Sequence, residues 1–157
     1  MTRLLDTEVP AAWSAIRAVR HDVGEVLTDH PTELRTATMM TASELLENAV
    51  KYGERMGGAP CISFSLVAAN GQLVVEVINR STSDNDVRGL EECIDRISRA
   101  PDRETIEKLY LARLEEVMAR NSEGGRLGLY RVALEGGFEL QCLWLDGVVT
   151  VRATRKL

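Results

Sequence analysis

The chain has 157 residues, of which 45% are hydrophobic and 27% are charged, and its formal net charge is −5. This length and balance are typical of one globular domain with its own core, so we predict that residues 1–157 form a single domain. The negative charge argues against a nucleic-acid surface, and no apolar run approaches the roughly 20 residues that a membrane span requires.

The cysteines and the start of the chain indicate the compartment. Cys61, Cys93 and Cys142 are far apart and odd in number, which predicts reduced core residues rather than a disulfide set or a metal site. The first residues lack the apolar region of a signal peptide. We therefore expect a cytoplasmic protein.

Two helices are predicted in the first third of the chain, after a lead-in over residues 1–9 that could be an edge strand. Pro10 suits a first helical turn, and the apolar residues that follow recur at helical spacing: Trp13, Ile16, Val19, Val23, Val26 and Leu27. A second helix is expected from Leu34 to Lys51, which contains no Gly or Pro. Its buried stripe is predicted at Leu34, Thr38, Ala42, Leu45 and Ala49.

The rest of the chain predicts two hairpins separated by helices. Strands over 61–68 and 72–79 are joined by Asn70-Gly71, and strands over 138–145 and 148–154 by Asp146-Gly147. Between the hairpins we predict helices over 84–99 and 102–120, a glycine-bearing loop over 121–128 and a short helix over 129–135. The apolar face of the 102–120 helix is expected at Ile106, Leu109, Tyr110, Leu114, Val117 and Met118. This order favours an α+β fold, a mainly antiparallel sheet with helices on one face.

Polar side chains line one flank of the second helix. Glu44 and Asn48 are four residues apart, so they lie one turn above the other, and Lys51 follows on the same flank. A carboxylate, an amide and an ammonium beside a buried stripe could form the edge of a site. A solvated edge with one Glu–Lys pair is the alternative.

The segment from Glu44 to Gly53 (ELLENAVKYG) resembles the N box of the GHKL superfamily, in the form found in anti-sigma-factor serine kinases. The resemblance implies that Glu44 is a general base and that the Asn48 side-chain oxygen holds the Mg²⁺ that bridges ATP phosphates. Lys51 would help electrostatically near phosphate. Phosphoryl transfer needs a hard oxygen ligand and a proton-accepting carboxylate, so the residue types suit this chemistry.

Residues 124–130 (GGRLGLY) are similar to the second glycine box of the superfamily. Glycines let the backbone approach phosphate closely, and a helix N-terminus offers free N–H groups. The resemblance implies that Gly125 and Gly128 supply backbone amides. Arg126 stands where a small residue is commoner and could itself contact phosphate. A plain loop with one packing glycine is the alternative.

The first glycine box, D-x-G-x-G in the superfamily, is altered here. Asn79 stands at the Asp position and Ser81 at the first Gly. Asn79 can still accept a hydrogen bond from an adenine amino group, but it lacks the carboxylate charge. A loss of about 1–2 kcal/mol would weaken binding about tenfold or somewhat more.

The order of the elements resembles the Bergerat-type two-layer sandwich over nearly the whole chain. The helices at about 84–120 would be a helical-hairpin insert at the ATP-lid position, and this pair is similar to that of SiaB-type protein kinases. Both insert helices carry apolar stripes. They could form a structural hairpin, or they could present a surface for a homodimer or another partner.

The resemblance implies an ATP- and Mg²⁺-dependent serine/threonine protein kinase-like regulator in a partner-switching system. Its partner would be a small regulatory protein such as a STAS-type antagonist or a response regulator. One alternative is a degenerate binding module of the same fold that regulates a partner without nucleotide. The other is a phosphotransfer protein that uses His21, because His21-Asp22-Val23 is similar to the H-D-L of phosphoaccepting histidines.

Overall fold

The computed structural model describes residues 1–54, 58–81, 83–120 and 126–157, which include both predicted hairpins and all the predicted helices. In chain order the elements are β1 (Thr2–Pro10), α1 (Trp13–Val26), α2 (Thr32–Tyr52), β2 (Pro60–Ala69), β3 (Gln72–Arg80), α3 (Asp84–Arg99), α4 (Arg103–Arg120), α5 (Leu127–Leu134), β4 (Glu139–Leu145) and β5 (Val148–Lys156).

The strands form one antiparallel sheet in the order β1-β2-β3-β5-β4. Both hairpin turns use left-handed backbone, with φ of 53° at Asn70 and 51° at Asp146, and each is followed by a glycine of positive φ. These turns match the twist of the paired strands. Because β5 pairs with β3, the last strand of the chain lies beside the first hairpin. The α+β fold expected from the sequence is confirmed.

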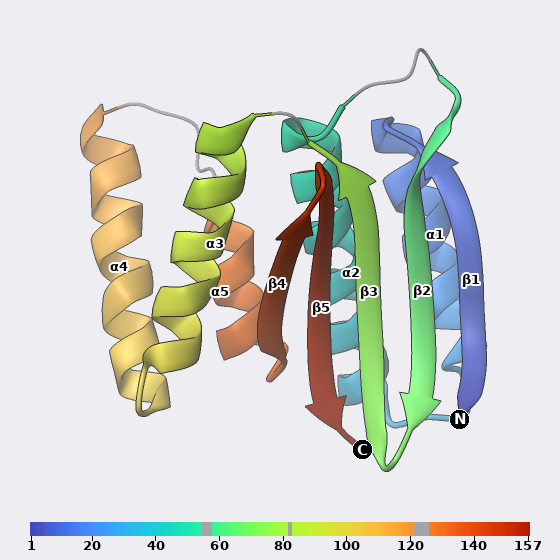
Figure 1. Cartoon of the computed structure of the whole chain (residues 1–157). Helices are drawn as coiled ribbons and strands as arrows, with labels where there is room; N and C mark the ends of the chain where they lie inside the picture. The colour runs from blue at the N-terminus through green and yellow to red at the C-terminus, as the bar shows by residue number, and fades with distance from the viewer. Residues whose placement is uncertain (55–57, 82, 121–125) are drawn as a thin grey trace.

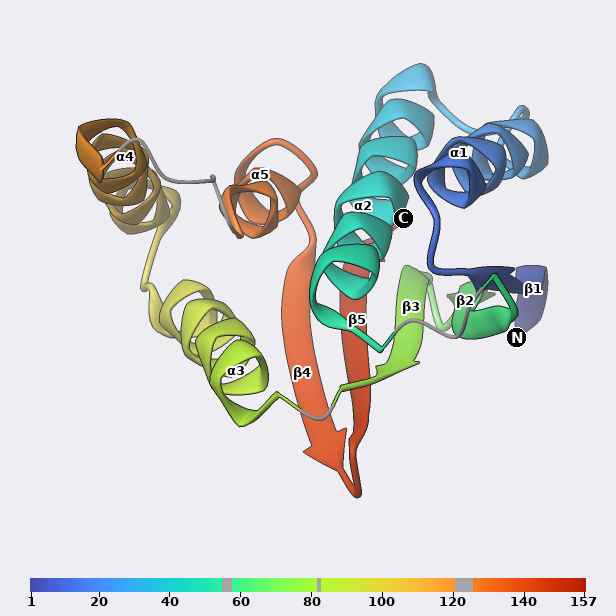
Figure 2. The ribbon, with the colours of Figure 1, turned by 90° about the horizontal axis from the view of Figure 1, so that it is seen from above.

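Helices α1, α2 and α5 cover one face of this sheet, and Figure 1 shows the opposite face in front, with no described helix over it. Helix α3 packs against the edge strand β4, where the Ser98 hydroxyl donates a hydrogen bond to the Leu140 carbonyl oxygen at 3.1 Å. Helix α4 lies outermost and packs on α5 (Figure 2). The 84–120 helices therefore flank the end of the sandwich where α5 and β4 lie.

Helix α2 is the centre of the core. Its predicted stripe is buried, and Ala42, Leu45 and Leu46 are at most 2% exposed. They belong to one apolar cluster with Phe64 of β2 and Val75 of β3. Fully burying a side chain of the Leu or Phe size contributes roughly 1.5–3 kcal/mol, so this packing fixes the rotation of α2 about its axis. That rotation places the polar flank of α2 toward α3 and α5.

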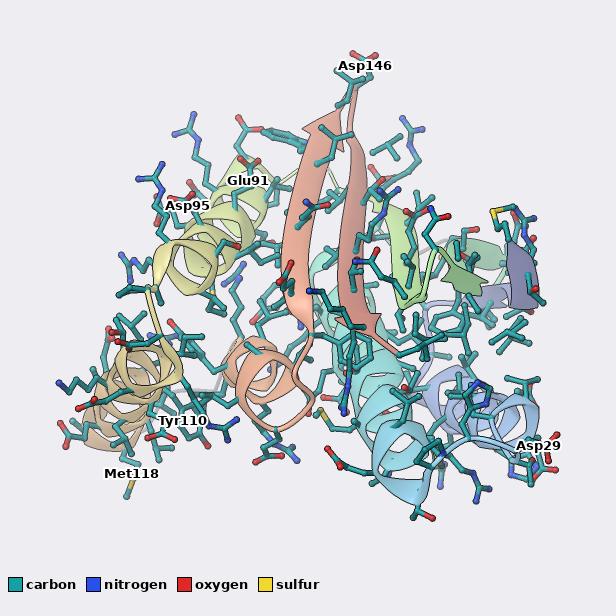
Figure 3. All side chains as sticks on the ribbon, turned by 90° about the horizontal axis from the view of Figure 1, so that it is seen from below. Asp29, Glu91, Asp95, Tyr110, Met118 and Asp146 are labelled. Carbon is teal, nitrogen blue, oxygen red and sulfur yellow. The ribbon has the colours of Figure 1, made fainter. Side chains whose placement is uncertain are left out.

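Three local expectations are wrong. Pro10 ends β1 instead of opening a helix, and Trp13, the first residue of α1, is 53% exposed because the turn at that helix end has no neighbouring layer to cover it. Met118 is 74% exposed and points away from the body of the molecule (Figure 3). In α4 it is Ile106, Leu109 and Tyr110, nearer its start, that pack against the core.

Only one of the three cysteines is a core residue. Cys93 of α3 is buried, whereas Cys61 and Cys142 are partly exposed, and all three are free thiols. Among the helices in the described part of the chain, none is long and apolar enough to cross a bilayer.

Candidate functional site

The second half of α2 presents Glu44 and Asn48 one turn apart, as the sequence predicts. Both side chains are partly buried, and they border different spaces. Asn48 borders a small cavity between α2, α3 and the sheet, whereas Glu44 borders an open groove between α1, α2 and α5. The two predicted residues are therefore neighbours that face in different directions.

The Asn48 amide is held in one orientation by its own helix. Its Nδ2 donates a hydrogen bond to the Glu44 carbonyl oxygen at 2.9 Å. Its Oδ1 is buried and has no hydrogen-bond partner among the residues that the structure describes. Leaving a buried acceptor unsatisfied costs about 1–3 kcal/mol, so an orphan of this kind needs an explanation. A bound cation is one partner that would satisfy this amide oxygen.

The cavity beside Asn48 has a volume of about 20 Å³. It is lined by Leu45, Asn48, Ala49 and Tyr52 of α2, Asn79 and Ser81 at the end of β3, Asp86, Val87 and Leu90 of α3, and Val149 and Val151 of β5. A space of this size holds about one water molecule. Small-molecule sites occupy roughly 300–1,000 Å³, so a nucleotide does not fit the cavity as it stands.

Arg126, at the start of α5, contacts two of the residues that line the cavity, Tyr52 and Asp86. Its guanidinium carbon lies 4.4 Å from the centroid of the Tyr52 ring, and its Nη2 donates to the Asp86 carbonyl oxygen at 2.6 Å. It also lies against Gly89 of α3, where an added Cβ would come within 3.0 Å of the guanidinium. One arginine thus bridges α2 and α3, and both of its main partners line the cavity.

The backbone at Arg126 is strained. Its φ is 71°, in the left-handed region that costs an ordinary L-residue about 1–2 kcal/mol. The other non-glycine residues with positive φ in the described ranges are Asn70 and Asp146, both in hairpin turns and both of types that tolerate this region well. Strain of this kind persists only where surrounding contacts hold it. The contacts of the guanidinium with α2 and α3 are those constraints.

Glu44 is held between one arginine and a glycine. Arg131 of α5 donates to its Oε1 at 3.2 Å, and Arg131 also pairs with Glu135. Burial raises the pKa of the Glu44 carboxyl above its usual value, and the charges of Glu47 and Glu135 act in the same direction. The charges of Arg131 and Arg20 lower that pKa. A carboxylate with a raised pKa is a better proton acceptor near neutral pH.

Gly128 is needed for the contact between α2 and α5. A Cβ built there would lie 1.7 Å from Oε2 of Glu44 and 2.5 Å from its carboxyl carbon. Only glycine lets the first turn of α5 approach the carboxylate this closely, and a carboxylate beside a helix N-terminus is favoured. The structure thus gives Gly128 a packing role. Gly125 falls outside the described residues.

Asn79 and Ser81 tie the end of β3 to the end of α2. The Asn79 amide nitrogen donates to the Arg80 carbonyl oxygen at 3.2 Å and occupies the place that a Cβ at Gly53 would need. The Ser81 hydroxyl, buried, donates to the Tyr52 carbonyl oxygen at 3.2 Å. Asn79 therefore borders the same cavity as Asn48, where the resemblance places it.

Lys51 and His21 lie further out. Lys51 is exposed, and its Nζ is 6.0 Å from the centroid of the Tyr52 ring. Arg126 contacts the same ring. His21 is exposed on α1. The structure therefore gathers Asn48, Asn79 and Tyr52 at one cavity, and Lys51 lies outside its lining.

Two residues of this arrangement are not predicted from the sequence. Tyr52 belongs to the N-box segment, but the sequence assigned it no role. In the structure the Arg126 guanidinium lies over its ring. Arg131 is absent from the predicted site, yet it lies three residues after Gly128, so the two share a face of α5 that meets Glu44. That spacing is the signal that could have found it.

A divalent cation and a nucleotide fit this site to different degrees. The buried, unpartnered oxygen of Asn48 suits a hard cation. No cluster of three or more His, Cys, Asp or Glu side chains suited to a metal occurs within the described ranges, so a cation at Asn48 would need further oxygens from a ligand such as phosphate. The nucleotide itself has no room while Arg126 lies between Tyr52 and Gly89.

No known family pattern matches the sequence, and no curated protein matches it either. Among solved structures, the chain is similar to the crystal structure of the RsbU and RsbW domains of Rv1364c from Mycobacterium tuberculosis, with a TM-score of 0.58 and 17% sequence identity. The match covers 100% of this chain and 33% of that chain, so this chain spans about a third of the protein it matches. At this identity the likeness shows the fold, and the expected Bergerat-type sandwich is confirmed at that level.

Proposed function

We propose that this chain is a kinase-like regulator of the partner-switching type, built as a single domain on the histidine-kinase-like ATPase fold. In this proposal Asn48 holds Mg²⁺, Glu44 is the general base, and Asn79 contacts the nucleotide base. Lys51, Gly125 and Gly128 contribute near the phosphates. The similarity to a structure that contains an RsbW domain supports the proposal at the level of fold.

The observation that carries the proposal is the buried Asn48 oxygen without a partner. Its amide nitrogen is already engaged with the Glu44 carbonyl oxygen, and the residue itself lines the cavity. A water in the cavity or a cation would each complete the hydrogen-bonding or coordination of this oxygen, and the melting experiment below distinguishes the two. Mg²⁺, when bound with ATP, would supply charge neutralisation on the phosphates, and Asn48 would orient it.

Glu44 and the groove beside it suit an acceptor hydroxyl from another protein. The groove has a volume of about 710 Å³, and Glu44 lies on its wall with Arg20, Ser43 and Arg131. A serine or threonine hydroxyl could reach the Glu44 carboxylate from this open side. The partner we propose is a small regulatory protein with such a residue, of the STAS-antagonist or response-regulator kind.

The test is thermal melting of Asn48→Ala with Mg²⁺-ATP. A ligand at about 100 times its Kd stabilises by roughly 2.7 kcal/mol, which for a chain of this length raises Tm by roughly 5–10 °C. We expect this rise in the parent chain and in the control Gln141→Ala, an exposed amide on β4, and its loss in Asn48→Ala. Equal rises in all three would show that Asn48 does not hold the cation.

A second candidate is a binding module that regulates a partner without nucleotide. The closed cavity of about 20 Å³ and the altered Asn79 and Ser81 positions favour it. In that case Mg²⁺-ATP and Mg²⁺-ADP would leave the Tm of a folded sample unchanged. The same melting experiment therefore separates the two candidates.

A further inference from the structure

The Arg126 side chain occupies the space between α2 and α3. Its planar guanidinium stacks on the Tyr52 ring and contacts Gly89, and a charge-assisted hydrogen bond to the Asp86 carbonyl oxygen secures it. Because Gly89 has no side chain, α3 leaves room for the guanidinium beside the Tyr52 ring. The slot between Tyr52 and Gly89 is filled by the chain's own arginine.

The Arg126 guanidinium contacts the Tyr52 ring and the Asp86 carbonyl oxygen, but these contacts leave one of its nitrogens without a hydrogen bond to the described residues. Its Nε is buried, and none of the residues in the described ranges pairs with it; its backbone has a φ of 71°. Asn48 lines the cavity together with Tyr52 and Asp86, and its buried Oδ1 likewise has no partner in the described part of the chain. The packed state thus leaves the Arg126 Nε donor and the Asn48 Oδ1 acceptor unpaired and keeps the Arg126 backbone strained. A ligand could pair with this donor and this acceptor.

We propose that Arg126 is a gating residue, an internal occupant that a nucleotide must displace before it can bind between α2 and α3. This inference rests on the proposed function for its ligand. While the guanidinium bridges Tyr52 and Asp86, it holds α3 against α2 and keeps the cavity at the size of one water. When it leaves, the slot beside Asn48 and Asn79 opens.

The consequence for affinity follows from population shift. When a ligand binds only the open state, its apparent Kd is the intrinsic Kd divided by the fraction of molecules that are open. A small open fraction therefore weakens the apparent binding. A stacked cation together with a charge-assisted hydrogen bond disfavours the open state, and losing both should strengthen apparent binding about tenfold or more. The gate therefore offers a second reason, besides the altered Asn79 position, for weak binding in the parent chain.

The test compares Arg126→Gly with Asn70→Gly. Glycine suits the positive φ at both positions, so Asn70→Gly, in a hairpin turn at the far end of β3, controls for a glycine introduced at a left-handed position away from Tyr52 and α3. Calorimetric titration with Mg²⁺-ATP gives the affinity. Hydrogen exchange of the amides at 86–90 in α3, without nucleotide, gives the opening.

We expect Arg126→Gly to bind Mg²⁺-ATP about tenfold tighter than the parent, and its α3 amides to exchange several-fold faster, with Asn70→Gly unchanged in both. Equal affinity in the parent and Arg126→Gly would overturn the gate while the proposed nucleotide site stands. If no variant binds Mg²⁺-ATP and α3 still exchanges faster only in Arg126→Gly, the bridging contact stands and the proposed function fails. Unchanged exchange would overturn the bridge itself.

Discussion

The pKa of the Glu44 carboxyl is raised by burial and lowered by neighbouring arginines. Its burial between α2 and α5 raises the pKa of its carboxyl, and the nearby Arg131 and Arg20 offset part of this effect. The carboxylate also lies against Gly128 and at the wall of the groove, so it is accessible from one side. A partly desolvated carboxylate held by one arginine is suited to accepting a proton from an incoming hydroxyl.

The raised pKa of Glu44 makes a prediction about stability. The folded protein holds this proton more tightly than the unfolded chain, so the contribution of Glu44 to the unfolding free energy is present below the ordinary carboxyl pKa of 4.5. That contribution is lost as pH rises through the raised pKa of the folded state. Glu44→Gln does not titrate, so its stability relative to the parent should increase as the pH is raised from about 4 to about 7.

Urea denaturation at a series of pH values measures this difference. The matched control is Glu115→Gln, which alters an exposed carboxylate on α4. A Glu44→Gln curve that stays parallel to that of the parent across the series would contradict the raised pKa.

At the scale of elements, the contact between α2 and α5 depends on the absence of a side chain at Gly128. Gly128→Ala would force the Glu44 carboxylate away, since the added Cβ would lie 1.7 Å from Oε2. We expect a loss of about 1–3 kcal/mol in the unfolding free energy, as for other overpacked sites. In a Glu44→Ala background the obstacle is gone, and the same substitution should cost much less.

A double-mutant cycle by guanidinium denaturation gives that comparison. A coupling energy near zero between Gly128→Ala and Glu44→Ala would mean that the first turn of α5 does not rest on the carboxylate.

The elements themselves were largely predictable, because hydrophobic periodicity and the Asn-Gly and Asp-Gly turns are local signals. The α2 stripe is buried as predicted, and α3 and α4 lie where two insert helices were expected. Trp13 and Met118 show the limit. Periodicity identifies the apolar face of a helix, but whether another element covers a given turn depends on packing that local sequence does not contain.

The candidate site shows the same limit. The spacing of Glu44 and Asn48 predicted their shared flank, but it did not predict that they border separate spaces. Nor could it place Arg126 against Tyr52, because that contact joins residues 74 positions apart and depends on how α3 and α5 pack around α2. Long-range side-chain contacts decide whether the predicted site is open.

At the scale of the whole molecule, the sandwich brings α2, the end of β3 and the start of α5 to one end of the sheet, and α3 closes that end (Figures 1 and 2). Asn48 and Asn79 border the closed cavity there, whereas Glu44 borders the separate groove between α1, α2 and α5. Binding of a nucleotide would therefore require α3 and Arg126 to move relative to α2. The movement would couple the occupancy of the site to the position of the 84–120 helices.

The proposed function depends above all on Asn48 holding a divalent cation together with a nucleotide. The most direct measurement is calorimetric titration of the parent chain with ATP, once with Mg²⁺ and once with the cation removed by a chelator. We expect measurable binding with Mg²⁺ and binding at least about tenfold weaker without it, since the cation joins the Asn48 oxygen to the phosphates. Equal affinity in the two titrations, or no binding in either, would contradict this role of Asn48.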